Sequence, residues 1–358
     1  MAIFRRILYS VLTMGIAWIA GYVLSIVDAP APFLLGSLFG VWLTGSFIKP
    51  LQTHIGVEPW IQRIIIFGLG VLLGSMFSPD FFRFVGTWSL SVSTMAVTTI
   101  FATWVVYQYF RRLFGYDPMT ALLCASPGGQ AEIVILCRDL VEKDYVVALC
   151  HLTRVASVFM LAPFLLAYTQ GQAAVEESNR LLFELPGLFE LPGIQLVQFF
   201  GLAVGGYYGG RLLRIPMPHM LGPMFASGIV HTLGWVELPR ISEVVMLAQL
   251  VIGGSIGARL SRVPWSEIAL YLGHALGATA IVLTLYVASA GLLSTVSDLS
   301  FLNLVIAFIP GGLHEVTLLA LLFSFDVAFV AFHHSIRVIV IFFSLPVLVS
   351  WLQKGSTR

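Results

Sequence analysis

The chain has 358 residues, of which 58% are hydrophobic and 10% are charged, and its formal net charge is +1 at pH 7. Soluble domains usually carry about 25% charged residues, so this composition excludes an ordinary soluble domain and predicts a polytopic membrane protein. The nearly neutral net charge gives no indication of nucleic-acid binding. The three cysteines have neither metal-ligand spacing nor the even number of a disulfide framework.

Ten apolar runs predict spanning helices, because each is close to the length of about 20 residues that crosses a bilayer. In chain order they lie at about 7–26, 32–48, 61–77, 87–109, 143–168, 195–212, 218–234, 243–258, 266–289 and 326–351. The first run follows Arg5 and Arg6, and no small-residue cleavage pattern comes after it. We therefore expect it to be a span and not a signal peptide.

Two further apolar stretches, 118–137 and 301–324, each carry a Pro-Gly-Gly element in the middle. The first element starts at Pro127 and the second at Pro310, which is an offset of 183 positions. The same offset pairs His151 with His334, Arg154 with Arg337, Pro163 with Pro346, Gly70 with Gly253 and Gly74 with Gly257. Residues 32–36 match residues 218–222 at an offset of 186 positions. We interpret this pattern as an internal duplication.

The duplication divides the chain into a first membrane repeat (1–168), a linker (169–194) and a second membrane repeat (195–358). The linker is recognised by its composition, since it contains glutamates and prolines between long apolar runs. Each repeat is expected to follow the same plan of helices.

Positive charge predicts the relative orientation of the repeats. If the Pro-Gly-Gly stretches are re-entrant hairpins, each repeat crosses the membrane five times, and the second copy is inverted. Of the 19 Lys and Arg residues, only Arg83, Arg180 and Arg240 then face outward. This distribution agrees with the positive-inside rule. If both Pro-Gly-Gly stretches crossed the membrane completely, each half would have six spans and the charge bias would largely disappear. If each stretch is instead a broken helix that crosses the membrane, and another span is missed or falsely assigned, the two repeats remain inverted. The expected fold is an all-α membrane protein with two inverted-topology repeats, about ten spanning helices and two re-entrant or broken helices.

The two helix breaks are the candidate substrate site. Irregular backbone at membrane depth is tolerated only where it is buried in protein or lines a watery cavity, and paired breaks in two repeats are typical of a transport site near the bilayer midplane. The helix after each break starts with free N–H groups that favour an anion. Substrate contacts are expected from Gly128, Gly129, Gln130, Gly311, Gly312 and Leu313. The alternative is a pair of ordinary kinks that allow close helix packing.

A glutamate follows each break within one helical turn, Glu132 in the first repeat and Glu315 in the second. Such a carboxylate either caps its helix or, because ionisable groups in a span are costly, takes part in proton or cation coupling. His314 precedes Glu315, while Ala131 stands at the equivalent position. His314 is therefore a candidate for proton coupling together with Glu315, and for a difference between the two half-sites.

Arg154 and Arg337 are expected near mid-span, where an arginine costs about 2.5–3.5 kcal/mol on insertion scales. His151 and His334 precede them by three residues and share their helical faces. Either each arginine neutralises a glutamate and fixes a break, or the arginines bind a small anion while the histidines exchange protons. In both cases the two arginines and the two glutamates should converge around the breaks. His333 points away from this face and is expected to be packed or hydrogen-bonded.

The segments ASPGGQAEIVILCRDL (125–140), HLTRV (151–155) and IPGGLHEVTLLALLFSFDVAFVAFHHSIRV (309–338) carry a resemblance to a known family. With residues 32–38 and 218–224, the chain resembles the membrane AbrB-duplication proteins over nearly its whole length; the position of Asp144 departs from the family's pattern. Members are often labelled regulators of gene expression or ammonia monooxygenases. The inverted design is also similar to that of sodium–proton antiporters and citrate carriers, and this likeness implies transport only by analogy of fold.

These observations predict a secondary transporter or exporter of a small anionic metabolite, coupled to a proton or sodium gradient, without enzymatic activity or cofactors; no Walker-type nucleotide loop occurs. The alternative is a membrane-embedded regulator or sensor that binds a small ligand. A monooxygenase would need a metal-ligand cluster, and only His314, His333 and His334 are concentrated in the sequence.

The expected partners are a small-molecule substrate and the lipid bilayer, but no nucleic acid, and a homo-oligomer is compatible with the sequence. The expected location is the bacterial inner (plasma) membrane, which the chain crosses several times, with both termini cytoplasmic.

Overall fold

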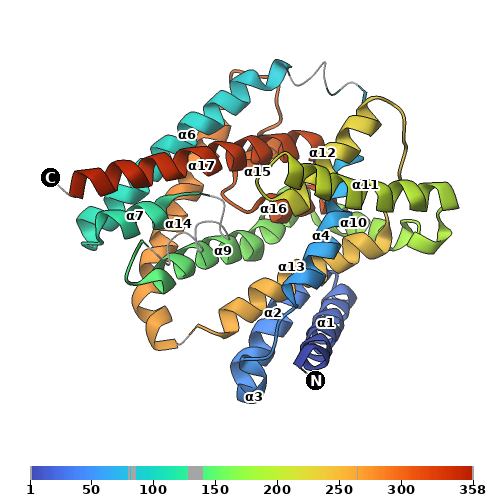
Figure 1. Ribbon diagram of the computed structural model, residues 1–358, viewed down its shortest axis with the longest axis horizontal. Helices are drawn as coiled ribbons and strands as arrows, with labels where there is room; N and C mark the ends of the chain where they lie inside the picture. Colours follow the sequence, from blue (N-terminus) through green and yellow to red (C-terminus); the bar gives the residue numbers. More distant parts are fainter. Residues whose placement is uncertain (1, 80, 82–85, 128–139, 264, 357–358) are drawn as a thin grey trace. The chain divides into compact units, whose positions relative to one another are not determined.

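The computed structural model describes residues 2–79, 81, 86–127, 140–263 and 265–356, and within these residues every regular element is a helix (Figure 1). Each of the ten predicted spans coincides with one helix to within a few residues. These helices are α1 (Ala2–Ile26), α2 (Pro32–Phe47), α4 (Pro59–Gly74), α6 (Ser89–Gln108), α9 (Asp144–Gln170), α11 (Gly193–Leu212), α12 (Pro218–Thr232), α13 (Ser242–Ser261), α14 (Trp265–Ser294) and α17 (Val327–Ser356).

Shorter helices lie between the long ones. They are α3 (Lys49–Gln52), α7 (Pro118–Ala125), α10 (Gln172–Glu184), α15 (Phe301–Phe308) and α16 (Leu313–Leu322), with 3-10 turns η1 (Gly86–Trp88) and η3 (Leu188–Glu190) and a π-helical turn η2 (Tyr109–Leu113). Proline opens α2, α4, α7 and α12, a position where its missing N–H costs no hydrogen bond. Asp117 caps α7 by accepting the N–H groups of Met119 (3.0 Å) and Thr120 (2.9 Å).

Six helical segments within the described residues are long and apolar enough to cross a membrane. They are Phe4–Ile26, Gly86–Leu113, Asp144–Gln170, Ser242–Ser261, Tyr271–Ser294 and Val327–Gln353. The helices α2, α4 and α16 are apolar but shorter. The chain is therefore an all-α polytopic membrane protein, and the number of ten spans stays a prediction.

The helices belong to two compact units, and each unit draws on both sequence repeats. The first unit comprises Met1–Arg83, Phe159–Val263 and Thr317–Ala328, and the second comprises Phe84–Val158, Pro264–Val316 and Phe329–Arg358. The predicted linker contains α10, which is held in the first unit by hydrogen bonds from Ser178 to Leu322 O and from Asn179 to Ala29 O. The compact units therefore do not follow the boundaries of the sequence repeats.

Inside the first unit, equivalent helices of the two repeats make equivalent contacts. α2 packs against α1 and α13, and α12 packs against α11 and α4 (Figure 1). A side chain at any of four glycines in α4 and α13 would collide with a main-chain oxygen of the crossing helix. The contacts are Gly253 with Leu34, Gly257 with Leu38, Gly70 with Met220 and Gly74 with Met224. Each glycine face therefore packs on a helix of the other repeat.

The turn before α2 recurs before α12. Asp28 (φ 48°) and Ala31 (φ 47°) are left-handed, and so are Arg214 (φ 54°) and Met217 (φ 48°), 186 positions later. Left-handed backbone is uncommon for residues other than glycine, so four such residues at one fixed offset are a structural trace of the duplication. The orientation of one copy relative to the other in the membrane stays a prediction.

Candidate functional site

The second Pro-Gly-Gly element interrupts a helix as predicted. α15 ends at Phe308, and α16 begins at Leu313. A Cβ added to Gly311 would collide with the side chain of Val316, and one added to Gly312 would collide with the carboxylate of Glu315. A residue larger than glycine at either position would therefore have to displace a neighbouring side chain at the start of α16.

Arg337 of α17 binds the backbone of this break. Its Nη1 donates to Phe308 O (3.2 Å) and Ile309 O (2.9 Å), and its Nη2 donates to Gly311 O (2.7 Å). The side chain is only 2% exposed. The planar guanidinium thus donates to Phe308 O and Gly311 O at the interrupted helix, and it adds a second donor to Ile309 O, which also accepts the N–H of Gly311 (2.9 Å).

His334 completes the same network one helical turn earlier. Its Nε2 lies 3.1 Å from Ile306 O, and its Nδ1 lies 2.7 Å from Arg337 Nη2. A carbonyl can only accept and a guanidinium can only donate, so Nε2 carries the hydrogen and Nδ1 accepts. In this arrangement the imidazole is a neutral link in the network, which favours a structural role over the expected proton exchange.

The first repeat makes the same contacts 183 positions earlier. Arg154 Nη2 donates to Ser126 O (3.1 Å) and to His151 Nδ1 (2.9 Å), and His151 Nε2 lies 2.9 Å from Leu123 O. Arg154 and His151 are 5% and 0% exposed. The remaining predicted residues of the first break, Gly128, Gly129, Gln130 and Glu132, lie outside the described residues.

Glu315 lies in the first turn of α16, at the position where a capping carboxylate is expected. It is 7% exposed, and its Oε1 lies 3.2 Å from Nε2 of the neighbouring His314. Among the described residues no salt bridge joins it to Arg337, so that arginine binds carbonyl groups and does not neutralise this glutamate. Leu313, the first residue of α16, is 1% exposed.

Tyr286 of α14 is a site residue that the sequence analysis did not identify. It is 1% exposed, its hydroxyl lies 2.8 Å from Thr99 Oγ1, and it interacts electrostatically with both Arg154 and Arg337. A tyrosine within an apolar span is a weak signal in the sequence, because its hydroxyl needs a buried partner. Tyr286 places the two arginines in one constellation within the second unit.

A cavity of about 460 Å³ adjoins Arg337 in the second unit. Its walls come from α6 and α17, and Ser126 and Pro127 of the first break also line it. Arg337 is the single charged side chain among the described lining residues, whose other members are mostly aliphatic and aromatic. The second arginine and the first break therefore meet at one largely apolar cavity.

Several buried polar atoms at this site have no hydrogen-bond partner. They are Arg154 Nε, Arg337 Nε, Glu315 Oε2, His314 Nδ1 and Thr153 Oγ1. Unsatisfied buried polar groups are rare, and each normally has a functional or solvent explanation. These atoms leave hydrogen-bonding capacity for a ligand or a proton.

His333 is separate from this network. Its Nε2 lies 2.8 Å from Ser91 Oγ, and its Nδ1 lies 2.8 Å from Phe329 O. This agrees with the expected hydrogen-bonded packing role. Among the described residues, no group of three or more His, Cys, Asp and Glu lies together in a way that could hold a metal ion.

Comparison with known proteins decides the family. The sequence profile described as "Transition state regulatory protein AbrB" matches residues 33–353. The chain belongs to the AbrB family. A relative in Bacillus subtilis (strain 168), "Uncharacterized protein YhjN", is 24% identical, with 89% of this chain and 90% of the relative aligned. A second AbrB-family relative in Escherichia coli (strain K12), "Putative regulator AbrB", is 23% identical, with 97% of this chain and 99% of the relative aligned.

Proposed function

We propose that this AbrB-family protein is a secondary transporter or exporter of a small organic anion, driven by a proton or sodium gradient, and that it has no enzymatic activity. The observation that carries the proposal is the pair of buried arginines that bind the backbone at the two breaks in one compact unit, where Arg337 meets a cavity. We place the protein in the bacterial inner membrane with both termini in the cytoplasm, on the basis of its loop charges.

The breaks support transport because hydrocarbon cannot satisfy an interrupted helix. Arg337 donates hydrogen bonds to the carbonyls of Phe308, Ile309 and Gly311, so these groups of the irregular backbone have a partner within the protein. Paired, stabilised breaks in a duplicated chain are a recurrent feature of secondary transporters.

The charges support an anionic substrate. Arg154 and Arg337 place two buried guanidinium groups near Tyr286, and neither has a salt-bridge partner among the described residues. The free Nε–H of Arg337 and the apolar walls of its cavity suit a carboxylate with a hydrocarbon body. Glu315 Oε2 is the candidate proton acceptor for coupling, because it is buried and without a partner.

Gradient-driven flux tests this function. The purified protein is reconstituted into liposomes and offered a panel of labelled carboxylates under an imposed pH or sodium gradient. We expect saturable accumulation of at least one carboxylate, abolished by dissipating the gradient and reduced at least tenfold in Arg337→Gln. Arg180→Gln, which changes an exposed arginine, should transport normally.

The second candidate is a membrane sensor, which the relative's printed description as a regulator favours. A carboxylate that stabilises the protein by binding but is not moved under either gradient would support the sensor and contradict the transporter.

A further inference from the structure

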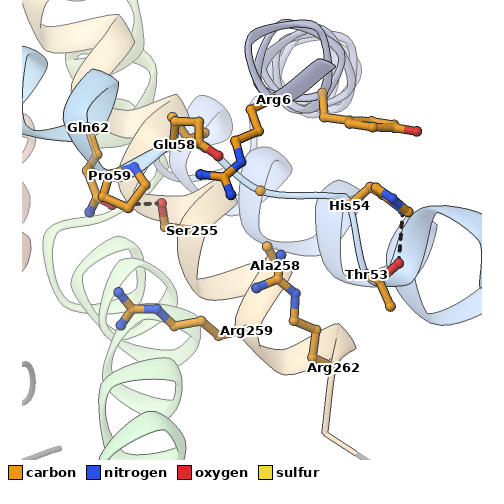
Figure 2. Close-up of a pocket in the computed structure, with 13 residues that line it drawn as sticks. Arg6, Thr53, His54, Glu58, Pro59, Gln62, Ser255, Ala258, Arg259 and Arg262 are labelled. Atoms are coloured by element: carbon orange, nitrogen blue, oxygen red, sulfur yellow. Dashed lines mark hydrogen bonds between the residues drawn. The ribbon is translucent and has the colours of Figure 1, made fainter. Parts of the chain in front are cut away.

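A second hollow, also of about 460 Å³, lies wholly within the first compact unit. Figure 2 shows Arg6 from α1 and Arg262 from the end of α13 extending toward the same space, with Glu58 at its edge. Arg259 lines the same hollow. Three arginines therefore surround a space whose lining includes one carboxylate.

Hydrogen bonds hold the loop that borders this hollow in place. Gly56 N–H donates to Thr13 Oγ1 (2.9 Å), and Glu58 N–H donates to Ser10 Oγ (3.0 Å). Arg262 Nη2 donates to Ile55 O (2.5 Å). The loop between α3 and α4 is thereby tied to both α1 and the end of α13, so the basic groups face a fixed surface.

Gly56 is required at this place for two reasons. Its φ of +142° is a conformation that L side chains rarely adopt, and a Cβ would lie 3.2 Å from the guanidinium of Arg262. A larger residue would therefore strain the backbone and shift the guanidinium of Arg262 slightly.

The three arginines outnumber the single lining carboxylate, Glu58. Burial and the neighbouring Arg259 guanidinium lower the pKa of Arg262, and among the described residues no salt bridge joins Arg6, Arg259 or Arg262 to a carboxylate. Arginines that converge without partners repel one another. A bound anion would remove this cost and accept several charge-assisted hydrogen bonds.

The duplicated sequence provides a comparison within the same chain. Gly74 and Gly257 are equivalent, so Arg259 corresponds to Met76, Arg262 to Pro79 and the lining residue Ser255 to Leu72. α4 ends at Gly74, before Met76 and Pro79, whereas α13 continues to Ser261, so the longer helix end and its two arginines belong to the second repeat.

The positive-inside rule accounts for basic residues at this membrane face but not for their convergence on one hollow. α1 begins and α13 ends beside this hollow, so it lies at the end of two spans. Arg211 and Arg214 are predicted at the same face by loop charge, yet they do not line it. This pair is therefore a matched control for general charge attraction.

We propose that this hollow binds a phosphate group through Arg6, Arg259 and Arg262. The group belongs either to the headgroup of an anionic lipid or to a free small molecule. The site lies in the first unit and is independent of the proposed transport site in the second unit.

Thermal unfolding of the full-length protein in uncharged detergent tests the site with two probes, inorganic pyrophosphate and dioctanoyl phosphatidic acid. Potassium sulfate at matched ionic strength and dioctanoyl phosphatidylcholine are the controls. We expect a saturable rise in the unfolding midpoint with at least one phosphate probe. The apparent Kd should rise about tenfold or more in Arg6→Gln/Arg259→Gln and stay unchanged in Arg211→Gln/Arg214→Gln.

The two probes separate the sources of the phosphate. Stabilisation by pyrophosphate indicates a free phosphate compound, whereas stabilisation by phosphatidic acid alone indicates a lipid headgroup. No saturable effect of either probe, or an equal loss in both arginine pairs, overturns the proposal.

Glu58→Gln keeps the test decisive if the arginine variants fold poorly. Its side chain has no hydrogen bond or salt bridge to any described residue, and its removal takes away the one carboxylate that repels an anion in the hollow. We expect the Kd of the effective probe to fall severalfold. An unchanged or higher Kd contradicts an anion site at this place.

Discussion

Arg337 and Arg154 occupy equivalent positions but hold their breaks by different numbers of described contacts. Arg337 donates to three main-chain carbonyls, whereas Arg154 donates to one, at Ser126. A buried acceptor that loses its donor costs about 1–3 kcal/mol. The residue equivalent to Gly311 is Gly128, which lies outside the described residues.

Replacing Arg337 with glutamine should lower the free energy of unfolding by about 2 kcal/mol or more, because Phe308 O and Gly311 O lose this donor while Ile309 O keeps the N–H of Gly311. Arg154→Gln should also lower it, because Ser126 O loses its donor. Arg337→Lys should recover only part of the loss, since an ammonium keeps the charge but not the planar fork. Unfolding in detergent measures all three, with Arg180→Gln as a control that should change stability by less than about 1 kcal/mol. Full recovery by lysine would show that charge, and not hydrogen-bond geometry, stabilises the break.

Tyr286→Phe should separate binding from stability. The variant removes one hydroxyl that contacts Thr99, so we expect a loss of about 1 kcal/mol in stability. If the hydroxyl orients the arginines toward the substrate, KM in the flux assay should rise severalfold while kcat changes little. Tyr168→Phe is the matched control, because Tyr168 is 87% exposed. Equal kinetics in both variants would exclude Tyr286 from the site.

At the scale of the element, the break between α15 and α16 combines a backbone interruption with two glycines whose replacement would displace the side chain of Val316 or Glu315. The carboxylate of Glu315 occupies the space that a Cβ at Gly312 would need. The shape of the break and the position of the coupling candidate are thus determined by the same contact.

Gly312→Ala should therefore displace Glu315 and cost about 1–3 kcal/mol, as overpacking does. The comparison is Gly273→Ala in α14, where nothing lies within 4 Å of an added Cβ. Alanine there should be neutral or stabilising by up to about 1 kcal/mol, because glycine is unfavourable inside a helix. The difference in unfolding midpoint between the two variants checks the contact. Similar midpoints would mean that Glu315 moves aside at no cost.

The helices and the second break were predictable because their causes are local in sequence. Apolar runs set the limits of α1, α9 and α17, and Pro-Gly-Gly set the end of α15. The partners of Arg337 were not predictable, since carbonyl acceptors are present at every residue and carry no sequence signal. For the same reason, the sequence did not predict that Tyr286 lies near Arg154 and Arg337.

At the scale of the whole molecule, the duplication predicts equivalent turns but not the assembly of the units. Asp28 and Arg214 share a left-handed conformation at the offset found in the sequence. Each compact unit combines segments of both repeats, and this composition depends on which helices pack together, as in the contact of Gly253 with Leu34. Small residues indicate that a close crossing exists, but they do not identify the partner helix.

The inverted arrangement predicts that these equivalent turns lie on opposite sides of the membrane. Val27 and Leu213 are 186 positions apart and are 69% and 73% exposed. Inverted repeats place Val27 outside and Leu213 in the cytoplasm, whereas parallel repeats place both on one face. In a background with Cys124, Cys137 and Cys150 replaced by alanine, Val27→Cys should react with a membrane-impermeant maleimide in intact cells. Leu213→Cys should react only after permeabilisation. Labelling of both positions from the same side would reject the inversion, and with it the expectation that the two broken helices enter the bilayer from opposite faces.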